Sequence, residues 1–193
     1  MNANDLPRLR SLLTSGDDDL AEGAVNQLAS LGRQSLPLLT EMLSTADADA
    51  RWWATRALSE INDPRVVPLL LERLNDADES VRHCALVALR LQPAPEAVGH
   101  LVKLLGNRDR LLAHLAADAL IAIEKAAVPA LVDSARNQSQ AARLEAMRAL
   151  ARIGDPASIP ILFAAYEEQS ALMEFWADEG LERMGVGMVF YKP

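Results

Sequence analysis

The chain has 193 residues, of which 50% are hydrophobic and only 4% are aromatic. Its 27 acidic residues outnumber the 19 basic residues, and the net charge of −8 argues against a nucleic-acid-binding protein. A single cysteine excludes an internal disulfide and a metal site made of several cysteines, and no apolar run approaches the ~18 residues of a membrane span. We therefore expect a cytoplasmic protein with no membrane segment.

Two columns of residues repeat along the chain at intervals of 30 or 31 positions. The first column consists of alanines, namely Ala24, Ala54, Ala85, Ala116, Ala146 and Ala177. A leucine follows each alanine four positions later, at Leu28, Leu58, Leu89, Leu120, Leu150 and Leu181. Such a period is the sequence signature of a protein built from stacked structural repeats.

Each repeat is predicted to contain two helices. A proline marks the first turn of the first helix, at Pro7, Pro37, Pro68, Pro129 and Pro160. A good N-cap residue marks the start of the second helix, at Asp17, Asp47, Asp78, Asp109, Ser139 and Ser170. The second helix is predicted to end near residues that accept a left-handed conformation, namely Gly32, Asn62, Gly154 and Gly185, while Pro93 and Glu124 make two irregular junctions.

The predicted fold is therefore all-α, an α-solenoid of about six helix pairs. Small alanines allow the helices to approach closely, and stacking of the repeats buries the apolar faces that no repeat can bury alone. We expect one domain over residues 1–185, with units at approximately 3–32, 33–62, 63–92, 93–123, 124–154 and 155–185. The tail, residues 186–193, is predicted to cap the last unit through Val189, Phe190 and Tyr191.

The third unit shows a family resemblance most clearly. It reads Asp-Pro-x-x-Val-Pro-x-Leu and then Asp-x-x-Val-Arg-x-x-Ala-x-x-Ala-Leu, from Asp63 to Leu89. This pattern resembles the HEAT-like repeat of the phycobilisome (PBS) lyase type. The resemblance implies a right-handed α-solenoid whose second helices line the concave face. It also implies that the arginine three positions before the alanine, at Arg51, Arg82 and Arg143, ties neighbouring repeats together.

Two columns on the second helix, two positions before and two after the alanine, are predicted to face solvent on the concave side. Arginines and aromatic residues are common anchors in protein interfaces, so these columns are the predicted partner-binding surface. Its candidate residues are Trp52, Arg56, His83, His114, Asp118, Arg148, Phe175 and Glu179. We expect Trp52 to be exposed there and Trp53 to pack between units, with burial of both rings as the alternative.

The sequence predicts an interaction scaffold rather than an enzyme, because no catalytic constellation, metal site or cofactor motif is found. Cys84 is expected to be a small buried side chain. The resemblance leaves open a bilin lyase or lyase-like subunit, in which Arg56 and Arg148 would pair with tetrapyrrole propionates. A DNA-binding or glycosylase-like protein would use Asp118 or Glu179, but the acidic balance argues against it.

The sequence also bears on related enzymes and on assembly. Deoxyhypusine hydroxylase, an iron enzyme of similar repeats, uses His-Glu dipeptides, which none of the three histidines here forms. A protein partner is expected. The chain is predicted to be a monomer or a weak homo-oligomer that associates through its acidic, aromatic C-terminal end.

Overall fold

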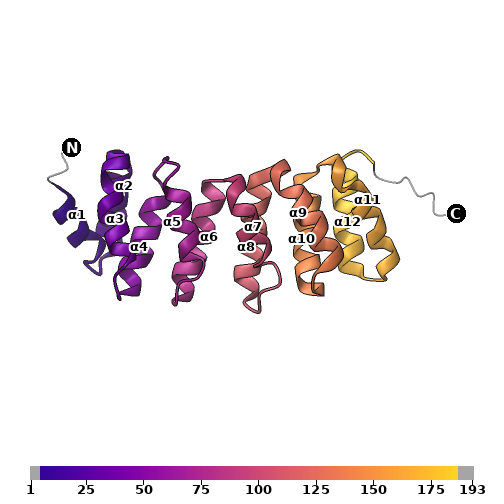
Figure 1. The fold of residues 1–193 in the computed structure, drawn as a ribbon, viewed down its shortest axis with the longest axis horizontal. Helices are drawn as coiled ribbons and strands as arrows, with labels where there is room; N and C mark the ends of the chain where they lie inside the picture. The colour runs from indigo at the N-terminus through magenta and orange to yellow at the C-terminus, as the bar shows by residue number, and fades with distance from the viewer. Residues whose placement is uncertain (1–4, 187–193) are drawn as a thin grey trace. The chain divides into compact units, whose positions relative to one another are not determined.

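The computed structural model describes residues 5–186, and the regular secondary structure in that range is entirely helical (Figure 1). The all-α class predicted from the sequence is confirmed. No helix within the described range is long and apolar enough to cross a membrane. The chain divides into two compact units, Met1–Gln92 and Pro93–Pro193.

The first unit contains three helix pairs, drawn from indigo to magenta in Figure 1. In each pair the first helix packs against the second, and the second helices of successive pairs also pack together, α2 against α4 and α4 against α6. The helices are α1 (Leu6–Leu13), α2 (Asp18–Leu31), α3 (Leu36–Leu43), α4 (Ala48–Ser59), α5 (Val66–Arg73) and α6 (Glu79–Leu91).

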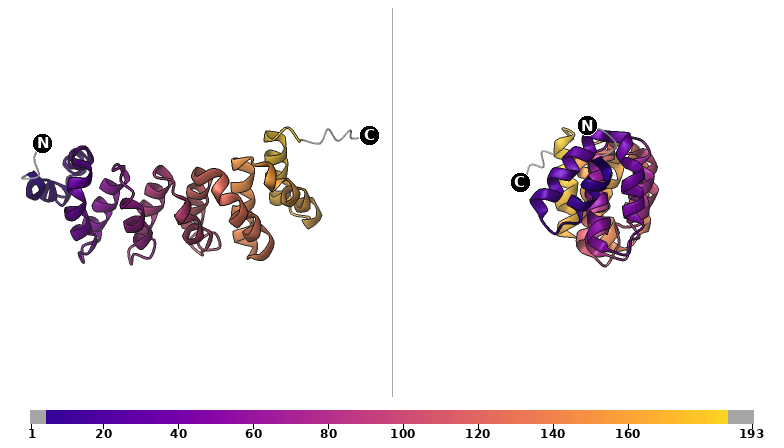
Figure 2. Two further views of the ribbon diagram at one scale, coloured as in Figure 1. Left: turned by 45° about the horizontal axis from the view of Figure 1, so that its top comes forward. Right: turned by 90° about the vertical axis from the view of Figure 1, so that its left-hand side faces the viewer.

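The second unit repeats this arrangement, with α8 packed against α10 and α10 packed against α12. Figure 2 shows the same helix pairs from two further sides. The helices are α7 (Val98–Val102), α8 (Arg110–Ile123), α9 (Val128–Asn137), α10 (Gln140–Ile153), α11 (Ile159–Ala164) and α12 (Ala171–Arg183). The tail residues Val189, Phe190 and Tyr191 lie outside the described residues, so their capping role stays a prediction.

The second helices begin where the sequence predicts. At the first five of these starts, from Asp17 to Ser139, the cap side chain accepts a hydrogen bond from a backbone N–H of the first turn. The last start differs from the prediction, because Ser170 occupies the cap position of α12 without a side-chain cap hydrogen bond. Proline lies at the beginning of α1, α3, α9 and α11, and Pro68 is the third residue of α5.

The alanine and leucine columns form the core, as predicted. All six alanines are fully buried, and the leucines that follow them are at most 1% exposed. Close helix approach is sharpest at Gly180 in α12, where an added Cβ would lie 2.9 Å from the Cα of Ala151 in α10. The core is therefore held by short side chains that bring backbones together, which explains why the chain can fold with so few aromatic rings.

The ends of α4 and α6, at Glu60 and Gln92, do not use a positive φ, and α8 reaches a positive φ without a glycine. Gly32 ends α2 with φ 52° and ψ −122°. Glu124 ends α8 with φ 59° and ψ −134°, almost the same backbone conformation, although it carries a side chain. This region of conformational space strongly favours glycine, so the predicted irregular junction at Glu124 is a site of local backbone strain.

Candidate interaction surfaces

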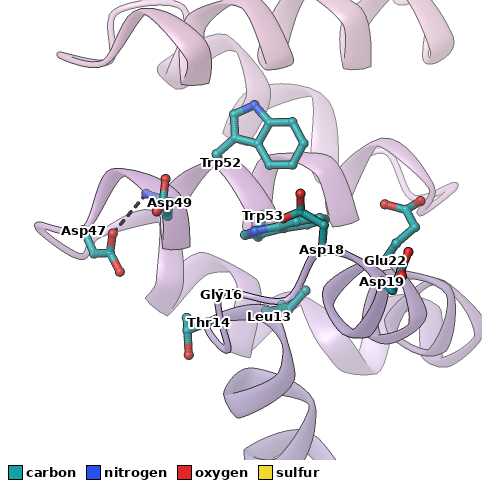
Figure 3. A pocket seen from close by; sticks show the side chains of 10 residues that line it. All are labelled: Leu13, Thr14, Gly16, Asp18, Asp19, Glu22, Asp47, Asp49, Trp52 and Trp53. Atoms are coloured by element: carbon teal, nitrogen blue, oxygen red, sulfur yellow. Dashed lines mark hydrogen bonds between the residues drawn. The ribbon is translucent and has the colours of Figure 1, made fainter.

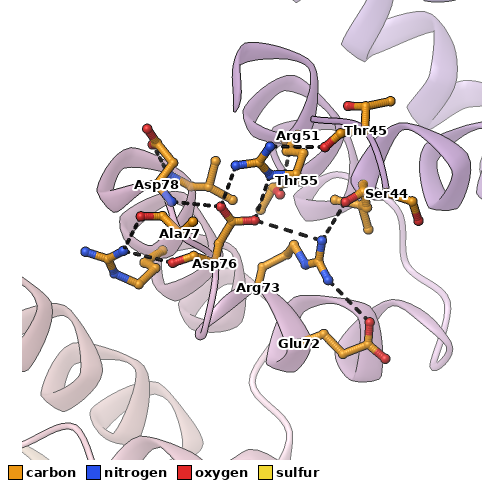
Figure 4. A network of polar contacts seen from close by, with 12 residues as sticks. Ser44, Thr45, Arg51, Thr55, Glu72, Arg73, Asp76, Ala77 and Asp78 are labelled. Carbon is orange, nitrogen blue, oxygen red and sulfur yellow. Dashed lines mark hydrogen bonds and ion pairs between the residues drawn. The ribbon is translucent and has the colours of Figure 1, made fainter. Parts of the chain in front are cut away.

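Two of the three arginines that stand three positions before the alanine, Arg51 and Arg143, tie neighbouring helix pairs together, as the resemblance implies, while Arg82 bonds within its own repeat. Arg51 on α4 makes a two-pronged ion pair with Asp76, its Nε at 2.9 Å from Oδ2 and its Nη2 at 2.8 Å from Oδ1 (Figure 4). Arg51 Nη1 also donates to the carbonyl of Thr45. Arg82 donates to the carbonyls of Asp76 and Ala77. The guanidinium groups of Arg51 and Arg82 are therefore engaged within the protein.

The Asp76 carboxylate is the centre of this network. Its side chain is only 4% exposed, and burial opposes its ionisation. Hydrogen bonds from Arg51 and from the backbone N–H of Asp78 outweigh that cost and hold the pKa of Asp76 below its ordinary value. An arginine in the same column joins two helix pairs in the second unit. Arg143 on α10 donates to the carbonyl of Ala135 and forms an ion pair with Glu168, which precedes α12.

Arg56, a predicted partner-binding residue, is joined to two carboxylates of the first unit. Its Nη2 lies 2.5 Å from Oε1 of Glu22 on α2, and its Nη1 lies 2.6 Å from Oε1 of Glu60. Its side chain is 28% exposed, so the group remains reachable from solvent. Glu22 stands two positions before Ala24, and Arg56 stands two positions after Ala54, the corresponding alanine of the next repeat. The two predicted surface columns therefore contact each other between α2 and α4.

The structure brings His114, Asp118 and Arg148 together in the second unit. Arg148 Nη1 lies 2.8 Å from Oδ1 of Asp118, and Nη2 donates to the carbonyl of His114 at 2.9 Å. Glu145 completes the cluster, with Oε2 at 2.9 Å from Arg148 Nε and 3.5 Å from His114 Nδ1. The expected exposure is not met at Arg148, which is 9% exposed, because the neighbouring α8 covers its guanidinium.

Phe175 lies on α12 and is 53% exposed, as the surface prediction requires. Its ring centroid is 4.9 Å from that of Trp176 in an edge-to-face arrangement, and the guanidinium of Arg152 on α10 lies 5.9 Å from the Trp176 ring centroid. Leu172, one turn before Phe175, is 59% exposed. Glu179, one turn beyond Phe175, is half-buried and lies 3.5 Å from Arg183.

His83 on α6 is half-buried, and Cys84 beside it points toward α4. The Sγ of Cys84 lies 3.9 Å from the carbonyl oxygen of Trp52. Burial raises the pKa of the Cys84 thiol to about 12, so the group stays protonated at neutral pH. Cys84 is half-buried rather than fully buried as expected, and its protonated thiol does not support a role as a nucleophile.

The two adjacent tryptophans of α4 are both half-buried and contact each other, so the expected division between an exposed Trp52 and a packed Trp53 is not observed. Their ring centroids are 4.8 Å apart with an interplanar angle of 89°. Both rings line a cavity of about 600 Å³ within the first unit (Figure 3). Its other lining residues come from the α1–α2 turn and the first turns of α2 and α4, namely Leu13, Thr14, Gly16, Asp18, Asp19, Glu22, Asp47 and Asp49.

Sequence reasoning missed this cavity. It assigned Asp17 the N-cap of α2 and expected Trp53 to pack between units. The sequence did contain a signal for it, because acidic residues at the start of α4, Asp47 and Asp49, lie within about one and a half turns of the Trp52–Trp53 pair. The period of the repeat would then have placed Asp18 and Asp19 beside them on the neighbouring α2.

Stacked helix pairs, packed through a column of buried alanines and tied by half-buried arginines, define an α-solenoid repeat protein. A family model for HEAT repeats matches residues 6–90, 67–140 and 98–182, and the chain therefore belongs to the HEAT-repeat family. A comparison with curated proteins gave no match.

Solved structures of similar fold support the same assignment. A chain of the CpcE–CpcF complex of phycocyanin lyase from Nostoc sp. PCC7120 is 21% identical, with a TM-score of 0.61 over 77% of this chain and 99% of that chain. Human deoxyhypusine hydroxylase in complex with glycerol is 21% identical, with a TM-score of 0.53 over 95% and 75% of the two chains. The predicted resemblance to phycobilisome-lyase HEAT-like repeats is thus confirmed, and at this identity it concerns the fold alone.

A designed armadillo repeat protein in complex with the peptide (KR)4 is also similar in fold. It is 22% identical, with a TM-score of 0.52, and the match covers 93% of this chain and 99% of that chain. Natural and designed solenoids therefore share this arrangement of helices, and function must be argued from the side chains of this chain.

Proposed function

We propose that the protein is a non-enzymatic interaction module that binds a segment of a protein partner along its second helices. The observation that carries this proposal is the exposure of two large apolar side chains on α12, one of them the predicted surface residue Phe175, in a chain whose core is made largely of alanine and leucine. Phe175 is 53% exposed and Leu172 is 59% exposed on the same side of α12. Exposed apolar groups of this size on one helix face are common in protein-interaction sites.

A cavity of about 380 Å³ adjoins this part of α12. It is lined by Leu172 and Met173 of α12, by Leu144 of α10, and by the paired side chains of Arg143 and Glu168, together with Gln140 and Ser170. An apolar side chain of a partner could therefore be buried beside Phe175, next to polar groups that satisfy its backbone. The predicted surface residues of the first unit, Trp52, Arg56 and His83, would supply the corresponding contacts there.

Similar solenoids with bound partners support the proposal in general terms. The lyase chain was solved as a complex of CpcE and CpcF, and the designed armadillo protein was solved with a peptide. The alternative of a tetrapyrrole-binding, lyase-like subunit has less support from the side chains. Arg56 and Arg148, the two groups expected to pair with propionates, already form ion pairs with Glu22, Glu60, Asp118 and Glu145.

Partner capture followed by quantitative binding tests this function. Immobilised protein would capture partners from host extract, and the identified partner would then be purified and titrated against the wild type and variants. We expect Trp52→Ala with Phe175→Ala to weaken binding at least about tenfold, as for interface anchors. The matched control replaces two half-buried apolar residues of first helices, Leu71→Ala on α5 with Val132→Ala on α9. Equal loss of binding in both double variants would overturn the assignment.

A further inference from the structure

We propose that the cavity beside Trp52 and Trp53 binds the cationic side chain of a lysine or arginine in a peptide segment of the partner. The inference rests on the proposed function, because it assigns a chemistry to one part of the segment that the module would bind. It concerns the first unit alone and uses residues from α1, α2 and α4, which Figure 3 shows around the cavity.

The walls of the cavity combine two indole rings with carboxylates. Figure 3 shows Asp47 and Asp49 on one side of the rings and Asp19 and Glu22 on the other. Its lining residues include no lysine, arginine or histidine. A cation entering this space would meet carboxylates and aromatic faces together, and an anion would be repelled.

Three of the carboxylates are available to a ligand. Glu22 is paired with Arg56, and Asp47 caps α4 by accepting from the backbone N–H of Asp49. Asp18, Asp19 and Asp49 form no salt bridge within the described part of the chain. They lie in the first turns of α2 and α4, where the partial positive charge of the helix N-terminus is small beside a full cation.

The fold itself does not require this composition. The equivalent cavity between the starts of α8 and α10 in the second unit has a volume of about 450 Å³ and is lined by Arg108 and Arg110, with Glu145 as its acidic residue. The cavity between α10 and α12 holds the Arg143–Glu168 pair. Cavities at the same place in the repeat thus tolerate basic side chains, and the purely acidic, tryptophan-lined version belongs to the first unit.

The dimensions and the apolar component favour a side chain over a bare metal ion. A volume of about 600 Å³ lies in the range of sites that hold organic groups. The long aliphatic stem of lysine or arginine can pack against the indole rings while its head group reaches the carboxylates. A guanidinium also stacks on aromatic faces, which makes arginine the better of the two ligands.

Direct titration of the full chain with short peptides tests the proposal. The probes are fluorescently labelled hexa-arginine, hexa-lysine and hexa-glutamate peptides at about 0.15 M salt, where long-range attraction is screened, together with Ca²⁺ and Mg²⁺ alone. The key variant is Asp18→Asn/Asp19→Asn/Asp49→Asn. Its matched control, Glu96→Gln/Glu167→Gln/Glu182→Gln, removes the same charge from exposed acids of the second unit.

We expect hexa-arginine to bind the wild type and the control equally, and to bind the cavity variant at least about tenfold more weakly. The single variant Trp52→Leu, which keeps an apolar side chain but removes the ring, should weaken binding severalfold. Circular dichroism would confirm that each variant is folded, and single Asp49→Asn and Asp19→Asn substitutions provide milder versions.

Equal hexa-arginine affinity for the two triple variants would overturn the proposal, as would Ca²⁺ or Mg²⁺ binding that exceeds peptide binding. Failure here is distinguishable from failure of the proposed function. If the cavity variant still captures the partner that Trp52→Ala/Phe175→Ala loses, the module binds a partner without a cationic anchor. If peptides bind but no partner depends on Phe175, the cavity assignment stands and the broader surface is wrong.

Discussion

Arg51 and Asp76 form a two-pronged ion pair between successive helix pairs, with both side chains largely shielded from solvent, at 12% and 4% exposure respectively. The pair joins α4 to the turn that precedes α6 and also organises the cap of α6, because Asp76 Oδ1 accepts from the backbone N–H of Asp78. One carboxylate thus connects repeat stacking with helix initiation.

Removing one member of this pair should destabilise the fold strongly, because the other would be left desolvated and unpaired. We expect Asp76→Ala to lower the free energy of unfolding by about 3 kcal/mol, measured by urea denaturation. The control is the ion pair of Arg65 with Asp63, in which Arg65 is 49% exposed. Arg65→Ala should cost less than about 1 kcal/mol. Similar losses in the two variants would show that the Arg51–Asp76 pair has no special structural role.

The same pair predicts a pH dependence. The pKa of Asp76 is lowered in the folded protein, so the unfolded chain takes up a proton first as the pH falls. The stabilisation is therefore complete above the unfolded value of about 3.9 and is lost as the pH falls through the lower folded value. Urea midpoints measured from pH 6 to pH 3 should fall less steeply for Asp76→Asn than for the wild type. Parallel curves would contradict the assigned pKa direction.

Glu124 offers a stabilising substitution. Its φ of 59° and ψ of −134° almost repeat those of Gly32, so Glu124→Gly should relieve backbone strain. We expect a gain of about 1 kcal/mol in the free energy of unfolding. Gly32→Ala is the reciprocal variant and should lose a similar amount, although an added Cβ there meets no atom within 4 Å. A loss of stability in Glu124→Gly would show that the conformation is not strained.

Two helical glycines should respond in opposite ways to alanine. At Gly180 an added Cβ would lie 2.9 Å from the Cα of Ala151 and 2.9 Å from Cδ1 of Leu162, so Gly180→Ala should force α12 away from α10 and cost about 1–3 kcal/mol. At Gly23 on α2 nothing lies within 4 Å, and Gly23→Ala should stabilise by about 0.5–1 kcal/mol through helix propensity. Thermal unfolding of both variants measures the difference, and stabilisation by Gly180→Ala would contradict the close packing.

The sequence was sufficient to predict the helices because the repeat is a local property. The cap residues from Asp17 to Ser139, the early prolines and the buried alanine column each follow from spacing alone, and the structure confirms them. Ser170 is the exception, since residue type gives the position of a cap but does not ensure that the hydroxyl makes the hydrogen bond.

The candidate surface was harder to predict because helical spacing does not reveal what a neighbouring repeat covers. Arg148 stands in a column that should face solvent, yet Asp118 from the preceding second helix binds it and buries it. The tryptophan-lined cavity was missed for a related reason. Its walls come from three helices, so no single stretch of sequence contains the pattern.

Oxidative footprinting of the protein with its purified partner tests the central claim most directly. The claim is that a partner segment lies along the second helices, and Trp52 and Phe175 report on the first and second units respectively. Hydroxyl-radical labelling read by mass spectrometry should show both rings protected in the complex, while Leu71 on α5 and Val132 on α9 keep the reactivity they have in the free protein. Protection of the first-helix residues, with Trp52 and Phe175 unchanged, would contradict the account.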